Sequence, residues 1–312
     1  MRYVYLDQNK WIDLAKAAAG RADGARFARA LKMAKEQVRA GDLIFPLSAI
    51  HIIETAKSPR LEQRQILARL MTELSQGVVL RASSQMLEGY VDWAVREFYS
   101  KTTNESPPQH FARGVEAAFD FDIRQTLGIP ERRAAALRSD LDSPEAWIDL
   151  LAFDHEAERK AGIDAVRTIG INAAKRSELV RAEAVAGGAD LQTMRRAYGA
   201  GLTMQFLKPL EESLRAIGRS VQEWGAEGPD KLMEFWTLIP FLSVELELHT
   251  QKHWEKSKEW EANDVLDIGA LSLAIPSCDV VVTERFWVNL ITKRGLAERY
   301  NARVLYDVAT MI

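Results

Sequence analysis

The chain has 312 residues, 47% of them hydrophobic, as expected for a globular protein with one large domain or two of ordinary size. Its net charge of -3 excludes a general attraction to nucleic acid or acidic membranes, so a polyanion would need a local basic patch. One cysteine, no signal peptide and no apolar stretch near the roughly 20 residues of a membrane helix predict a cytoplasmic protein.

Strands and helices are expected to alternate over the first hundred residues, as in an α/β domain. Short apolar runs bounded by turn residues predict strands at 3–6, 43–47 and 78–80. Helical spacing of Ala, Leu and Lys predicts helices at 10–40, with a break near the glycines at 20–24, and at 49–57, 60–75 and 84–99. Ser48 is the expected N-cap of the helix at 49–57.

Residues 101–254 carry no strand pattern and are predicted to be a helical insertion. After it, the sequence predicts a helix at 264–275, a strand at 279–283, a helix at 285–294 and a strand at 303–306. The expected fold is therefore α/β with a mainly parallel sheet. Its core is made of 1–100 and 255–312, interrupted by the large helical insertion 101–254.

Carboxylates gather at one predicted edge of this sheet. Asp7 and Glu284 each follow a strand, so both lie at the carboxyl edge if the strands are parallel. Asp264 and Asp267 start the helix that feeds the strand 279–283 from its other end, so they should return to the same edge. Glu54 lies about two turns into the helix after the second strand, also near that edge.

Each of these acids, taken alone, is more typical of a solvated or capping residue, and Asp264 and Asp267 would suit a first helical turn through the dipole alone. Crowded in one cleft, however, they would repel one another strongly. A divalent cation, Mg²⁺ or Mn²⁺, is the usual remedy. Asp279 starts its strand and is expected to be structural, well away from Glu284.

The segments VYLDQN, PLSAIHIIE and DIGALSLAIPSCDVVVTE resemble the PIN-domain superfamily of metal-dependent ribonucleases. The resemblance covers 1–100 and 255–312 and implies a three-layer PIN-like core. It also implies an acidic metal site made by Asp7, Glu54, Asp267 and Glu284, with Asp264 as the rival of Asp267.

The sequence departs from the family pattern at two points. Glu284 directly follows the Thr, and Arg285 stands where the family more often has Asp. The insertion is also larger than a typical member carries. Asn9 matches the small polar residue that often follows the first acid, and we expect it to contact substrate.

The expected function is Mg²⁺- or Mn²⁺-dependent endonuclease action, on RNA rather than DNA, with the acids Asp7, Glu54, Asp264, Asp267 and Glu284 in the site. Basic residues at 285–303 could bind the phosphate backbone. Of these, Arg285, Lys293 and Arg294 are the expected substrate contacts, although cations near a helix C-terminus also favour its dipole. The alternative is a catalytically inactive PIN-like adaptor, whose insertion binds a protein or nucleic-acid partner or forms a homodimer.

Two further patterns have both a functional and a structural interpretation. Glu245, His249 and His253 form one helical stripe that could bind a transition metal, although such stripes are more often solvated faces. Trp254, Trp260 and Trp287 could stack on bases, although tryptophan in helical proteins is usually core or interface. We expect Trp260 to face RNA if the insertion forms a wall or lid beside the active edge.

Overall fold

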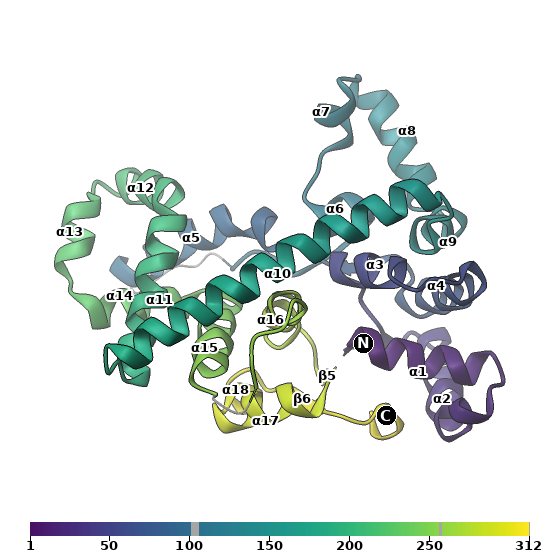
Figure 1. The fold of residues 1–312 in the computed structure, drawn as a ribbon. Helices are drawn as coiled ribbons and strands as arrows, with labels where there is room; N and C mark the ends of the chain where they lie inside the picture. Colours follow the sequence, from purple (N-terminus) through teal and green to yellow (C-terminus); the bar gives the residue numbers. More distant parts are fainter. Residues whose placement is uncertain (101–105, 256–257, 312) are drawn as a thin grey trace. The chain divides into compact units, whose positions relative to one another are not determined.

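The computed structural model describes residues 1–100, 106–255 and 258–311 (Figure 1). It is an α/β structure, 70% helical, with a four-stranded parallel sheet and a long helical stretch. The chain divides into two compact units, which differ from the expected core and insertion. The first contains Met1–Ala82, His110–Thr168 and Ser277–Ile312, and the second contains Ser83–Gln109 and Ile169–Pro276.

The first unit is built on a sheet with the strand order β2-β1-β5-β6. The strands are β1 (Arg2–Leu6), β2 (Leu43–Ile44), β5 (Val280–Val282) and β6 (Arg303–Leu305). Every neighbouring pair is parallel, with Val4 opposite Val280 in the central pair. The prediction of a mainly parallel sheet is therefore confirmed. β2 is shorter than expected, because Pro46 has no N–H to donate and the ladder ends before it.

The first unit also contains a second, two-stranded sheet, β3-β4. β3 (Val78–Leu80) pairs antiparallel with β4 (Phe111–Arg113), and Leu47 forms an isolated parallel bridge with Val79. The ring of Phe111 stacks on Tyr3 with centroids 3.9 Å apart. The expectation that no strand would occur between 101 and 254 is wrong at β4, whose three residues are too few to show a period.

The first unit contains many helices, whose starts match the sequence prediction to within two residues at 10, 49, 60 and 285. They are α1 (Gln8–Ala18), η1 (Ala22–Phe27), α2 (Ala28–Arg39), α3 (Ala49–Ala56), α4 (Leu61–Ser75), α6 (Val115–Phe119), α7 (Ile123–Leu127), α8 (Glu131–Leu141), α9 (Pro144–Ala152), α17 (Arg285–Lys293), α18 (Leu296–Arg299) and η2 (Val308–Thr310). Apolar residues of α1, η1, α2, α3, α4, α6, α9 and η2 meet the sheet in one core that includes Leu6, Trp11, Phe45, Trp147 and Val282. This core fixes the strand ends that carry the candidate site.

Helix α10 (Glu156–Ala186) starts in the first unit and continues into the second. The other helices of the second unit are α5 (Ser83–Ser100), α11 (Leu191–Gln205), α12 (Leu207–Ala216), α13 (Val221–Ala226), α14 (Pro229–Leu238), α15 (Pro240–Trp254) and α16 (Asp264–Ala274). Their core is aromatic, with Tyr90, Trp224, Phe235, Trp236 and Phe241 buried together. Most residues of α15 are buried, including the polar Glu247, Gln251 and Lys252.

None of the helices in the described part of the chain is both long and apolar enough to cross a membrane.

Candidate active site

Asp7 is the junction between the central strand and the first helix. Its N–H donates to the carbonyl of Val282 at 2.8 Å, which extends the β1–β5 ladder, and its side chain caps α1. Oδ1 accepts from the backbone N–H of Gln8 at 2.7 Å, and Oδ2 accepts from the hydroxyl of Thr283 at 2.9 Å. Both oxygens are therefore held in place before any ligand arrives.

Burial raises the pKa of Asp7, because a low-dielectric surrounding disfavours its charged form. The Thr283 hydroxyl and the Gln8 N–H lower the pKa in part, whereas the negative charge of Glu284 raises it further. The site thus holds a carboxylate whose negative charge is poorly compensated. A cation bound there would stabilise the ionised form.

Glu284 follows β5 and precedes α17, and it is exposed. Asn9 donates through Nδ2 to Oε1 of Glu284 at 2.9 Å. The amide oxygen of Asn9 is buried and has no hydrogen-bond partner among the described residues. Together with Asp7, these groups offer oxygen ligands only, the kind that Mg²⁺ and Mn²⁺ prefer.

The strand order gives this position a special place in the sheet. From β1 the chain moves outward to β2 on one side, and it later returns to place β5 and β6 on the other side. The order therefore reverses between β1 and β5, and Asp7 and Glu284 follow those two strands. In open α/β sheets, ligands bind at the carboxyl edge at such a reversal.

Glu54 lies on α3 and forms an ion pair with Lys57, the C-cap residue of that helix. It also lines a cavity of about 440 Å³ that includes Gln8, the residue after Asp7. Glu54 and the other acids do not form the expected cluster among the described residues. Within 1–100, 106–255 and 258–311, no three His, Cys, Asp or Glu residues are grouped to hold a metal ion.

Asp264 and Asp267 belong to the second unit, in the first turn of α16. Asp264 is buried, and its Oδ2 lies 3.0 Å from Nζ of Lys252 and accepts from the N–H of Glu261 at 2.7 Å. Nζ of Lys258 lies 3.8 Å from the other carboxylate oxygen, Oδ1 of Asp264. Asp264 therefore has a structural role in its own unit. Asp267 is half-buried.

Asp279 lies at the start of β5, at the opposite end from Glu284. Its Oδ2 accepts from the backbone N–H of Tyr3 at 2.7 Å, which ties the start of β5 to β1. The structural role that the sequence predicts for Asp279 is the one the structure gives it.

The three basic residues lie on or next to α17. Arg285 starts the helix beside Glu284, and its guanidinium lies 4.6 Å from the ring centre of Tyr306, with both side chains exposed. Lys293 and Arg294 lie at the other end, about 12 Å further along at 1.5 Å per residue. Of the three, only Arg285 therefore lies beside Glu284.

The histidine stripe of α15 is built into a polar cluster within the second unit. The hydroxyl of Tyr198 lies 3.0 Å from Nδ1 of His249 and 2.8 Å from Nε2 of His253. Burial lowers the pKa of His249 to about 3 and that of His253 to about 4, so both are neutral at pH 7. Glu245 lies 3.9 Å from Nε2 of His249, and burial raises the pKa of Glu245 to about 7.

Trp260 packs against both histidines and is 6% exposed, so the expectation that it faces RNA is wrong. Trp287 is fully buried in the first unit, and Trp254 is 40% exposed. The burial of Trp260 and Trp287 is the usual role of tryptophan in a helical protein.

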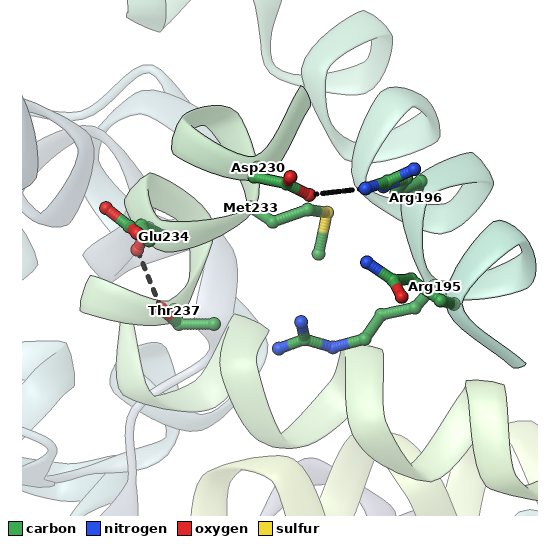
Figure 2. Close-up of a pocket in the computed structure, with 7 residues that line it drawn as sticks. Arg195, Arg196, Asp230, Met233, Glu234 and Thr237 are labelled. Carbon is green, nitrogen blue, oxygen red and sulfur yellow. Dashed lines mark hydrogen bonds and ion pairs between the residues drawn. The ribbon is translucent and has the colours of Figure 1, made fainter. Parts of the chain in front are cut away.

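Figure 2 shows a cavity of about 250 Å³ in the second unit, between α11 and α14. Arg196 donates to Asp230 at 2.7 Å, and Arg195 donates to the buried carboxylate of Glu247 at 2.8 Å. The side chain of Met233 points into the space between Asp230 and Arg195. The arginines are therefore neutralised by acids of their own unit, and the cavity has no uncompensated positive charge to attract an anion.

Comparisons of the chain with family models, with curated proteins and with solved structures find no match.

Two residues of the site, Thr283 and Gln8, were not expected from the sequence. Thr283 was visible in the segment VVVTE, but its hydrogen bond to Asp7 needs the β1–β5 register. Gln8 stands between two expected site residues, and only the packing of α1 on α3 and α4 shows that it lines a cavity.

Proposed function

We propose that the first unit is a PIN-like nuclease that hydrolyses phosphodiester bonds in RNA with the help of a Mg²⁺ or Mn²⁺ ion. One observation carries the proposal: Asp7 and Glu284 follow adjacent parallel strands on either side of the point where the strand order reverses. RNA is the substrate class that the resemblance of the sequence segments implies.

The residues present fit a hard divalent cation. Asp7 and Glu284 supply carboxylates, and the amide oxygen of Asn9 is buried without a partner beside them. The raised pKa of Asp7 has the sign expected of a carboxylate that is held for a cation. When bound, such an ion supplies a water activated for attack and stabilises the departing oxygen. Glu54, Asp264 and Asp267 are not needed for this ligand set.

The protein's own residues have separate roles in this proposal. Thr283 and the N–H of Gln8 fix the two oxygens of Asp7, and Asn9 orients Glu284. Arg285 holds a phosphate beside Glu284, with its guanidinium steadied by the ring of Tyr306. Lys293 and Arg294 contact phosphates further along the strand, so binding weakens as salt rises.

The test compares two substitutions at opposite ends of the same strand pair. Asp7→Asn removes a proposed ligand charge, and Asp279→Asn removes an exposed carboxylate whose oxygen acceptor for Tyr3 is retained. We expect Asp7→Asn to abolish Mn²⁺-dependent cleavage of single-stranded RNA and Asp279→Asn to retain it. The melting temperature of Asp7→Asn should equal or exceed that of wild type, because a poorly compensated buried charge is removed.

Wild-type protein that binds no Mn²⁺ by calorimetry and cleaves neither RNA nor DNA would overturn the proposal. The inactive adaptor, binding a partner through its helical part, would then replace it.

A further inference from the structure

A cavity of about 440 Å³ lies within the first unit, between α1, α3 and α4. Its volume falls in the range of about 300–1,000 Å³ that is typical of small-ligand sites. Apolar side chains form much of its wall, among them Ile12, Ala15 and Leu67. It also includes Gln8, which directly follows Asp7 in the chain, so an occupant would lie close to the proposed scissile phosphate.

Gln8 lines this cavity, and its side chain carries one unpaired acceptor. The side chain is 8% exposed, and its Nε2 donates to the hydroxyl of Thr55 at 3.0 Å. Its Oε1 is buried and has no hydrogen-bond partner among the described residues. An unpaired buried acceptor is costly, so a ligand that donates a hydrogen bond here would gain the compensation that the empty protein lacks.

Six more polar side chains line the same cavity, those of Lys16, Arg21, Glu54, Lys57, Ser58 and Gln63. Glu54 supplies a carboxylate that accepts hydrogen bonds, and Lys57 supplies an ammonium that donates them. Their side chains are 19% and 27% exposed, so a ligand that enters the cavity can share the pair's hydrogen bonds. Ser58 and Gln63 bond each other, with the Ser58 hydroxyl donating to Oε1 of Gln63 at 3.3 Å. Besides these two and the exposed cations Lys16 and Arg21, the cavity offers acceptors on Gln8 and Glu54 and a donor on Lys57.

We infer that this cavity binds a guanine base of the RNA next to the scissile phosphate. The inference rests on the proposed function, because it names the base preference of that same site. Guanine is the RNA base whose pairing edge carries one acceptor, O6, and two donor groups, N1–H and N2–H₂. These match Lys57 as donor and Glu54 and Gln8 as acceptors. The apolar wall covers the faces of the ring, as in sites that hold an unstacked base.

The other three bases leave polar groups of the cavity unmatched. Adenine and cytosine each present a single donor group on this edge, and uracil presents one N–H between two acceptors. Each would place an acceptor against Glu54 or leave Gln8 unpaired, and a site built for hydrogen bonds strongly rejects a ligand that lacks them. Base discrimination is therefore expected to come from these two side chains.

Two cations at the rim suit the phosphate attached to the base. Lys16 and Arg21 line the cavity and are 31% and 53% exposed. They pair with the nearby acids Asp13 and Asp23. Such exposed pairs are weak, so a phosphate can compete for the cations.

The experiment measures binding of the four nucleoside 5′-monophosphates to the full chain by calorimetry in the presence of EDTA, which separates binding from cleavage. We expect GMP to bind at least about tenfold more tightly than AMP, CMP or UMP. Glu54→Gln, which replaces an acceptor oxygen by a donor, should remove this preference.

A matched pair of substitutions tests the location. Ala19 and Ala18 are both exposed at the end of α1, but only Ala19 lines the cavity. Ala19→Trp should fill the cavity and weaken GMP binding at least about tenfold, while Ala18→Trp should leave it unchanged. Circular dichroism and melting temperature confirm that both variants fold.

The outcomes separate this inference from the proposed function. Equal binding of all four nucleotides, or equal effects of Ala18→Trp and Ala19→Trp, would overturn the guanine site even if Asp7→Asn abolishes cleavage. Selective GMP binding that depends on Glu54 and Ala19, in a protein that cleaves no RNA, would support the cavity assignment while the nuclease proposal fails.

Discussion

The ion pair between Lys252 and Asp264 gives the sharpest test of how the second unit is held together. The two side chains are 0% and 2% exposed, and the charged atoms lie 3.0 Å apart. The ammonium of Lys252 also donates to the carbonyl of Glu259 at 2.8 Å. Asp264→Ala removes the carboxylate and leaves the buried ammonium with its carbonyl partner and a cavity where the side chain was.

The expected loss in the free energy of unfolding is about 3–5 kcal/mol, the usual cost of removing one partner of a buried pair. This loss cannot exceed the free energy needed to remove the proton from Lys252, because Lys252 can become neutral instead of staying charged without its partner. Burial already lowers the pKa of Lys252. Neutralising a lysine of ordinary pKa at pH 7 costs about 5 kcal/mol. A loss of this size is a large fraction of the roughly 5–15 kcal/mol that stabilises a typical domain.

The sign of the pH dependence follows from the same proton. If Lys252 is neutral in the folded variant, the unfolded state binds one more proton, so stability rises with pH. The destabilisation by Asp264→Ala should therefore shrink by about 1.4 kcal/mol per pH unit above pH 7. The double variant Lys252→Met/Asp264→Leu should lie close to wild type, because an apolar pair of similar volume often replaces a buried ion pair without loss.

Urea denaturation followed by tryptophan fluorescence suits the measurement, since Trp260 is buried with its ring centre 5.7 Å from Nζ of Lys252. A loss below about 0.5 kcal/mol, the size of an ordinary surface substitution, would refute the structural role of the pair. If Asp264→Asn also kept its stability but lost RNA cleavage, Asp264 would belong to the catalytic site, as the sequence suggests.

Two further predictions concern one buried histidine and one glycine. His51 accepts the N–H of Ser48 on Nδ1 and donates from Nε2 to the carbonyl of Leu6, and burial lowers its pKa to about 4. The stability that neutral His51 adds is complete above pH 6.5 and is lost as the pH falls from there through about 4, because unfolding takes up a proton in that range. We therefore expect wild type to lose about 3 kcal/mol more of its free energy of unfolding in acid than His51→Asn does, as measured by urea denaturation. At Gly199 an added Cβ would lie 2.2 Å from Sδ of Met233, whereas Gly201 in the same helix has open space. Gly199→Ala should therefore be about 1–3 kcal/mol less stable than Gly201→Ala by the same measurement, and equal stabilities would contradict this close approach of α11 and α14.

The parallel sheet could be predicted because its strands carry an unmistakable pattern. VYL in β1 and VVV in β5 are unbroken apolar runs, as expected for strands covered on both faces. Their polarity alone places Asp7 and Glu284 at one edge. β4 could not be predicted, because the residues FAR form a strand only through pairing with β3.

Two acids of the expected cluster, Glu54 and Asp264, have cationic partners that the sequence did not predict. Glu54 forms an ion pair with Lys57, three residues further along the chain. The i,i+3 spacing allows this pair, but it does not favour the pair over a solvated carboxylate. Asp264 finds Lys252 because α16 packs on α15, and no periodicity within either helix encodes that contact. The boundaries of the two units are likewise set by packing, since 115–168 is mainly helical yet belongs to the unit that holds the four-stranded sheet.

The three residues after β1 would serve both of the proposed sites. Successive side chains at the start of a helix point about 100° apart. Asp7 is therefore directed to Thr283 at the end of β5, Gln8 to Thr55 and the neighbouring cavity, and Asn9 to Glu284. Because all three depend on the same β1–α1 junction, the proposed metal ligands and the proposed base site share a rigid frame. An RNA strand whose base enters the cavity beside Gln8 would thereby bring its adjoining phosphate toward the neighbouring Asp7.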